Sequence, residues 1–202
     1  MTRRMQRLML AMMLVLVLLG NLAAMAQREQ SGKARSSGAQ KTSASKTMPY
    51  RSVKWGFCAA FPSGWKAEEL FSGDLLQATN PGMKVSVITL GAFNNNNEEG
   101  RKPKSLEDVA EDAEDHLRDQ MVKELAAKNE PTRVAGLPAL ITRQSYFEHG
   151  QPWRAKELRV QRGDGVVVEL VLRAQAGAFE QLEKSFGEMI AKAFRPACDG
   201  SQ

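Results

Sequence analysis

The sequence predicts an α+β fold in which an antiparallel sheet is flanked by two main helices. Three observations support this prediction. Short apolar runs alternate with turn residues, and two longer stretches carry apolar residues every three or four positions. The elements also follow an order of several strands, one helix, three strands and a second helix. A helix with one apolar stripe must bury it against another element, and an antiparallel sheet offers a matching apolar face.

Residues 1–26 are typical of a cleavable export signal. A cationic start precedes an unbroken apolar run over residues 8–19, and small residues flank Met25. We therefore expect cleavage between Ala26 and Gln27, and a protein that is periplasmic or secreted. The apolar run is shorter than the roughly 20 residues of a membrane-spanning helix. The alternative is that the signal stays uncleaved as a short anchor.

Residues 27–48 predict a flexible basic linker, because the stretch holds no aromatic residue and no Val, Ile or Leu. Its basic residues permit at most weak contact with an anionic membrane surface.

The whole chain has a net charge of +5, but the signal and the linker carry that positive excess and leave the remainder slightly acidic. Since a nucleic-acid-binding domain concentrates its cations on its folded surface, we expect no nucleic-acid partner. Residues 49–198 are expected to form a single domain, followed by a tail at 199–202.

The first half of this domain predicts four strands joined by short turns, which favours an antiparallel meander. The expected strands cover residues 55–61, 65–70, 75–79 and 83–90. Pro, Ser, Gly and Asn residues between them favour turns. Residues 92–104 are polar, with four consecutive asparagines, and predict a mobile loop.

A helix is expected to begin after Ser105. The Ser105 hydroxyl can accept a hydrogen bond from the backbone N–H of Asp108. The Asp108 carboxylate can in turn accept one from the backbone N–H of Ser105, which completes a capping box. One apolar stripe follows at helical spacing, formed by Leu106, Val109, Ala110, Ala113, Leu117 and Met121. We expect this helix to run to about Lys128 and to end before Pro131.

The second half predicts three strands and a final helix. The expected strands cover residues 139–147, 153–161 and 166–172, with hairpin turns at 148–151 and 163–165. The 166–172 segment is continuously apolar, so we place it in the centre of the sheet. The last helix is expected over residues 178–194, with a buried stripe formed by Phe179, Leu182, Phe186, Met189, Ile190 and Ala193.

Four short motifs together resemble the PsbP-like and DcrB-like proteins. The segment 56–66 resembles their opening strand and F/Y-P-x-x-W turn, and 105–110 resembles the start of their central helix. The segment 134–139 resembles their GLPA strand entry, and 193–195 their closing pattern. The resemblance spans roughly residues 50–195. It implies an α/β/α sandwich and an exported, non-catalytic role, but it transfers no ligand or catalytic residue. Metal-binding residues of the photosynthetic members have no counterpart that we can match here.

The two cysteines, Cys58 and Cys198, favour a structural disulfide. Export implies an oxidising compartment in which cysteines pair. The sequence has no C-x-x-C motif and no nearby cation that would activate a thiol. The alternative is a pair of free thiols.

The remaining candidate site residues are weaker. His116 has Asp112 four residues before it, which is ligand spacing on a helix, but two residues make an incomplete metal set. His149 lies in an expected turn. Trp55 and Trp153 would form a binding patch if both are exposed on one face, whereas core packing is the alternative. We therefore expect no catalytic, cofactor-binding or metal-ligating residue.

The sequence thus favours an exported, non-catalytic accessory or binding module of the cell envelope. Its partner would be an envelope protein or a small ligand that the sequence does not identify. The alternative function is an envelope hydrolase whose site is assembled from residues distant in sequence. That alternative requires His116 or His149 to meet a carboxylate or a serine.

Overall fold

The computed structural model describes residues 48–70, 75–83, 86–95, 103–120 and 122–198. The expected signal with its cleavage site at Ala26 and Gln27, the linker up to residue 47, and the tail at 199–202 lie outside the described residues. None of the helices within the described ranges is long and apolar enough to cross a membrane.

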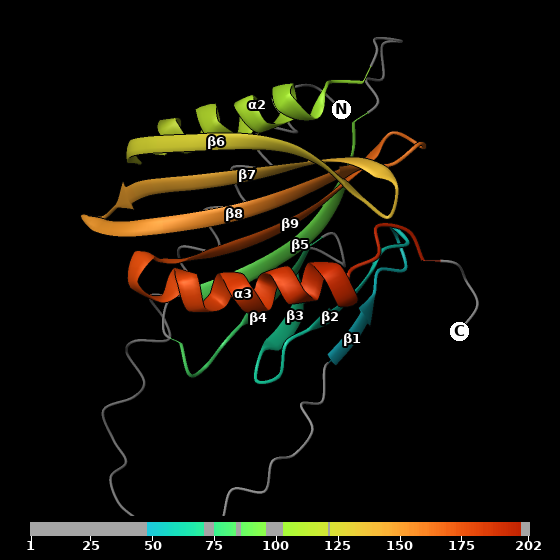
Figure 1. Cartoon of the computed structure of the whole chain (residues 1–202), viewed down its shortest axis with the longest axis horizontal. Coiled ribbons are helices and arrows are strands. Elements are labelled where there is room, and N and C mark those ends of the chain that lie inside the picture. Colours follow the sequence, from blue (N-terminus) through green and yellow to red (C-terminus); the bar gives the residue numbers. More distant parts are fainter. Residues whose placement is uncertain (1–47, 71–74, 84–85, 96–102, 121, 199–202) are drawn as a thin grey trace, which may run out of the picture. The chain divides into compact units, whose positions relative to one another are not determined.

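The described part of the chain forms a seven-stranded antiparallel sheet, a separate two-stranded sheet and two helices (Figure 1). The elements are β1 (Met48–Arg51), β2 (Cys58–Phe61), β3 (Lys66–Leu70), β4 (Leu75–Thr79), β5 (Ser86–Asn94), α2 (Leu106–Asp119), β6 (Lys123–Val134), β7 (Leu137–Glu148), β8 (Gln151–Gln161), β9 (Val166–Gln175) and α3 (Ala176–Lys192). The large sheet has the order β3-β4-β5-β9-β8-β7-β6, and β1 pairs with β2. This arrangement confirms the α+β class with two main helices.

Strand β9 lies at the centre of the large sheet, between β5 and β8, as its apolar run predicted. Adjacent residues Val167 and Val168 are both fully buried although successive side chains on a strand point to opposite faces. Val168 belongs to the main core, to which α3 contributes Phe179, Leu182, Phe186 and Met189. Val167 belongs to a second, smaller cluster with Leu140 and with Leu106 and Ala110 of α2.

The prediction of the first strand, over residues 55–61, is wrong in two respects: the residue at which the strand starts and the strand with which it pairs. Strand β2 pairs with β1 in the separate sheet, and only β3, β4 and β5 form the expected meander. Residues before Phe57 turn instead of extending, because Ser52 accepts the Gly56 N–H at 3.0 Å and Gly56 has φ +67°. Positive φ is readily available to glycine, so this residue closes the β1–β2 connection.

The helix expected to reach Lys128 ends at Asp119, and β6 occupies the segment that follows. The Lys-Glu-Leu-Ala-Ala-Lys stretch favours a helix locally, but the hydrogen-bond ladder with β7 overrides that preference. Glu124 has φ +55°, and the register shifts between Lys123 and Ala126, so the chain enters the strand through a bulge. Pro131 is tolerated because β6 is the edge strand of the sheet.

The boundary after β5 also differs from expectation, whereas the predicted hairpin turn at residues 148–151 is confirmed. Strand β5 continues through Asn94, because β9 supplies partners as far as Val166, so the loop expected from residue 92 starts later. Its segment 96–102 lies outside the described residues. The turn between β7 and β8 is formed by His149 and Gly150, both with positive φ, which is typical of a two-residue hairpin turn.

The predicted disulfide between Cys58 and Cys198 is formed, with a Cα–Cα distance of 5.9 Å. Backbone hydrogen bonds bring the two ends together. Cys58 and Arg195 exchange N–H···O bonds of 2.9 and 2.8 Å, and the Cys198 N–H donates to Gly56 O at 2.7 Å. The bridge therefore fastens the segment after α3 to β2.

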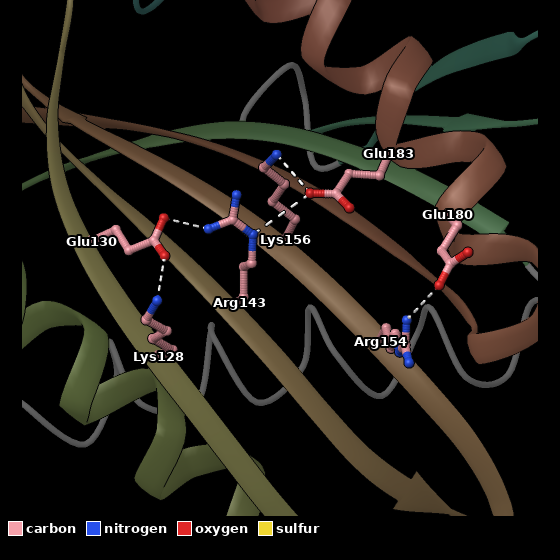
Figure 2. Close-up of polar contacts among 7 residues, drawn as sticks. All are labelled: Lys128, Glu130, Arg143, Arg154, Lys156, Glu180 and Glu183. Carbon is pink, nitrogen blue, oxygen red and sulfur yellow. Dashed lines mark hydrogen bonds and ion pairs between the residues drawn. The ribbon is translucent and has the colours of Figure 1, made fainter.

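Ion pairs connect α3 to the strands at the β6 edge of the sheet (Figure 2). Glu183 of α3 accepts from Lys156 Nζ at 2.8 Å and lies 3.6 Å from Arg143 Nε. Arg143 also pairs with Glu130 of β6, which lies 2.9 Å from Lys128 Nζ. The hydrogen bond from Lys156 and the charge of Arg143 hold the pKa of Glu183 below its usual value, although partial burial acts against them.

A double variant, C58S/C198S, is expected to lower the free energy of unfolding by about 3–5 kcal/mol, because the bridge closes a loop with a sequence separation of 140 residues. Denaturant unfolding under oxidising conditions measures the loss. The wild-type protein with reductant serves as the control and should match the variant. An unfolding curve of the wild type that does not respond to reductant would contradict this expectation.

Replacing Glu183 with Gln should cost stability at pH 7 but not at low pH. Because folding lowers the pKa of Glu183, its stabilisation is present above the ordinary value near 4.5 and is lost as pH falls through the folded value. Glu183 is partly exposed, so we expect a loss of about 0.5–1 kcal/mol at pH 7.

Denaturant unfolding of E183Q and wild type at pH 7 and pH 3 measures this difference. Glu188→Gln is the matched control, since Glu188 pairs only with Lys192 on the exposed surface of the same helix among the described residues, at 3.5 Å. An E183Q deficit of equal size at both pH values would show that the carboxylate charge is not its cause.

Candidate functional site

A hollow of about 710 Å³ lies where three connections of the fold meet. The start of α2 contributes residues 103–107, the β6–β7 hairpin contributes 131–133 and 138–139, and the β8–β9 turn contributes 161–165. Connections between regular elements commonly carry binding residues on a rigid scaffold. This hollow is therefore the first place to look for a ligand site.

The entry to α2 is held in place by side-chain hydrogen bonds. Ser105 Oγ accepts the Asp108 N–H at 3.0 Å, and Asp108 Oδ2 accepts the Ser105 N–H at 3.3 Å, which confirms the predicted capping box. Asn95 is buried and donates through Nδ2 to Lys104 O at 2.8 Å and to Gln161 Oε1 at 3.1 Å. The end of β5 is thereby tied both to the helix entry and to the end of β8.

The β8–β9 turn forms a second rigid wall. Asp164 Oδ1 accepts the Val166 N–H at 3.2 Å, and its other oxygen pairs with Arg162. Arg162 also donates to the carbonyl oxygen of Trp55, across a large sequence separation. Partial burial would raise the pKa of Asp164, but Arg162 and the Val166 N–H outweigh it and hold the pKa below its usual value. The Asp164 carboxylate is therefore charged at neutral pH.

The hollow combines charges of both signs with apolar surface. Its cations are Lys104, Arg133 and Arg162, and its acids are Glu107 and Asp164. Lys104 pairs with Asp112 outside the hollow, whereas Arg133 donates through Nη1 to the Gly136 carbonyl at 2.8 Å. In the described residues, no ion pair engages Arg133 with a carboxylate. Such a lining suits the binding of a polar ligand.

A second polar assembly is buried in the sheet where α2 contacts β6, β7 and β8. Arg159 donates from Nη2 to Glu157 Oε2 at 2.5 Å and from Nη1 to Thr142 Oγ1 at 3.2 Å. Its Nε lies 2.8 Å from Glu169 Oε1. Burial raises the pKa of Glu157, with Arg159 acting against that rise. We refer to Glu157, Arg159 and Glu169 as the buried triad.

Arg173 of β9 contacts side chains of β7 and β8 close to the turn that joins these two strands. Its guanidinium lies 4.5 Å from the centre of the Trp153 ring and 5.7 Å from that of Tyr146, and it pairs with Glu148. Cation–π contacts of this kind stabilise partly buried arginines. Burial raises the pKa of Tyr146 to about 12, so its hydroxyl stays protonated at neutral pH.

The structure does not bring the two candidate tryptophans together. The Trp55 carbonyl contacts Arg162, which directly follows the end of β8, whereas Trp153 lies near the start of the same strand. Both are partly buried, and Trp55 packs against the main core. Trp55 therefore lies at the end of β8 that borders the hollow, and Trp153 at the opposite end.

The two histidines also lie apart. His116 of α2 has Nε2 3.0 Å from the Gln120 amide nitrogen, and His149 is exposed in the β7–β8 turn. Among the described residues, neither forms a hydrogen bond or ion pair with a serine or a carboxylate. Within the same ranges, no three His, Cys, Asp or Glu side chains gather to hold a metal ion.

Sequence reasoning missed the hollow although it recognised two of its walls. The Ser105 cap and the 163–165 turn were both predicted, but their proximity depends on the register between β5, β9 and β8. Asn95 lies in the segment predicted to be a mobile loop, and no feature of the four consecutive asparagines indicates that this residue is buried. Arg133 lies between the expected helix and the next expected strand, and it belongs to no sequence motif that would mark it as a binding residue.

Comparison with known proteins gives a likeness of structure alone. No protein-family model matches the sequence, and no curated protein matches it either. The solution structure of cyanobacterial PsbP (CyanoP) from Synechocystis sp. PCC 6803 is similar with a TM-score of 0.59 and 11% identity, covering 79% of this chain and 97% of that one.

Two further solved structures share the arrangement. LpqN, involved in cell envelope biogenesis of Mycobacterium tuberculosis, has a TM-score of 0.52 and 14% identity, covering 75% of this chain and 92% of LpqN. The Ran-binding protein Mog1p of Saccharomyces cerevisiae has a TM-score of 0.53 and 8% identity, covering 75% of this chain and 96% of Mog1p. At sequence identities this low, structural similarity shows a shared fold but does not show a shared function. The described part of this chain therefore has the PsbP-like fold, as its four sequence motifs suggested.

Proposed function

We propose that the chain is an exported, non-catalytic accessory or binding module of the cell envelope, and that the hollow is its binding site. The observation that carries this proposal is the hollow itself, in which three connections hold cations beside apolar surface. The fold-level likeness to LpqN, a protein of envelope biogenesis, supports the envelope role. The disulfide between Cys58 and Cys198 supports an oxidising compartment.

The chemistry of the lining favours a ligand or partner segment with an anionic group. Lys104 and Arg162 are engaged by Asp112 and Asp164, which leaves Arg133 as the cation of the lining without an ion pair in the described residues. A guanidinium binds a carboxylate or phosphate through two parallel hydrogen bonds. Arg133 is therefore the residue that we assign to ligand binding.

The same proposal includes the α/β/α sandwich implied by the family resemblance. Val167 clusters with α2 residues and Val168 with α3 residues, and adjacent strand residues point to opposite faces. The two helices would thus cover opposite faces of the central strands. In this arrangement, the hollow lies at the end of the strands, beside the start of α2.

Export predicts a defined mature N-terminus. When the full chain is expressed with a C-terminal tag in a bacterial host, the protein recovered from the periplasm or medium should begin at Gln27, as measured by intact-mass analysis. The matched variant Ala26→Lys places a large charge at the cleavage site and should retain the signal. Wild-type protein that stays in the cytoplasm with an intact N-terminus would contradict export.

Binding through the hollow predicts a selective loss in the variant Arg133→Ala. Capture of partners by the tagged full chain from its native envelope fraction, with chemical cross-linking, should fall about tenfold, because a charge-assisted pair contributes roughly 1.5–3 kcal/mol. Arg118→Ala is the matched control, since Arg118 is an exposed arginine on α2 outside the lining. Equal recovery with R133A and wild type would show that the hollow is not the binding surface.

A further inference from the structure

The contact between α2 and the sheet contains little apolar surface. The residues that α2 buries are Leu106, Ala110 and Leu117, whereas α3 buries four large side chains. Complete burial of a large apolar side chain contributes about 1.5–3 kcal/mol. On this basis, α2 is held to the sheet by roughly half the hydrophobic stabilisation that holds α3.

The sheet surface that shares a face with the α2 cluster is polar. Leu140, which packs with α2, has Arg159 as its direct neighbour on β8, and Thr142 has Glu157. Direct cross-strand neighbours point to the same face. The buried triad therefore lies on the face against which α2 packs. Its two carboxyl groups share one guanidinium, and the charges of Glu169 and of Glu114 on α2 add to the burial that raises the pKa of Glu157.

Packing α2 over this polar surface has a free-energy cost, because charged and polar groups are removed from water. The Arg159 side chain is only 2% exposed, and removing a charged group from water costs several kcal/mol that pairing repays only in part. Gln144 lies on the same face and is 4% exposed, and within the described residues neither of its amide atoms has a hydrogen-bond partner. Each buried polar group without a partner destabilises the closed state.

Apart from Leu140 and Val167, which cluster with α2, the rest of the fold keeps its main contacts without this helix. Strands β7, β8 and β9 are joined by continuous antiparallel ladders, and the main core contains α3 and no α2 residue. Separation of α2 would therefore leave the ladders and the α3 core in place while water reaches the buried triad. Local openings of this kind occur in elements with few apolar contacts.

We propose that α2 is a releasable cover that separates from the sheet and unwinds in a local opening, without unfolding of β9 or α3. The opened state exposes a polar sheet face bearing Thr142, Gln144 and the buried triad. This inference does not rest on the proposed binding role of the hollow.

Native-state hydrogen exchange of the full chain tests the proposal. In the wild type, the mid-helix amides of α2 (residues 110–117) should exchange at least tenfold faster, relative to their intrinsic rates, than those of β9. Lys184→Gly replaces an exposed residue of α3 and lowers its helix stability, which should raise the exchange of β9 about three- to fivefold. It should leave α2 exchange unchanged, since α3 stays folded when α2 opens.

Glu111→Gly is the matched variant on the exposed surface of α2. It weakens the closed state relative to both the open and the unfolded states, so exchange should rise in α2 and in β9 alike. Both substitutions lie at exposed helix positions and leave the core intact. The proposal is overturned if K184G accelerates α2 and β9 by the same factor, or if wild-type α2 is protected as strongly as β9, because α2 would then open only in global unfolding.

Discussion

The burial of β9 on both faces is the constraint on which the rest of the structure depends. Val167 and Val168 are each fully buried, so a cover is required on either side of the strand. The antiparallel neighbours β5 and β8 satisfy its backbone groups, which leaves side-chain burial to the helices. Val168 is buried with α3 residues in the main core and Val167 with α2 residues in the smaller cluster, so each helix contributes to the burial of this strand.

The contacts of the two helices with the sheet differ in character. The α3 cluster is apolar and contains aromatic side chains from β2 and α3, including Phe61 and Phe186. The α2 side holds the buried triad, whose members gain little net energy from pairing because both signs of charge are desolvated. Its effect is on register: a slip of one residue in β8 would turn Arg159 to the opposite face of the strand, where Leu158 and Val160 belong to the main core. The triad thus penalises the wrong alignment more than it stabilises the right one.

The strands of the second half and the last helix were predictable because hydrophobic periodicity and hairpin turns determine them locally. Strand β6 was not, since its composition favours a helix and only pairing with β7 makes it extended. The partner of β2 was equally inaccessible, because it depends on a turn at Gly56 and on contacts with Arg195 far along the chain. The hollow required the register of three strands, which no local pattern contains, although two of its walls were recognised as a helix cap and a turn.

A fold shared at 8–14% identity preserves the pattern of burial rather than particular side chains. Function must then be argued from the site, since one fold supports many functions. Here the strand ends and connections provide that site, and three of its charged groups have structural partners: Arg162 pairs with Asp164 and contacts the Trp55 carbonyl, and Lys104 pairs with Asp112 of α2. Arg133 stands on the β6–β7 hairpin with only a turn carbonyl as a partner in the described residues. Arg133 is exposed and no carboxylate of the described residues pairs with it, so its replacement removes a charge from the lining without breaking an ion pair. A variant at this position can therefore test binding separately from folding.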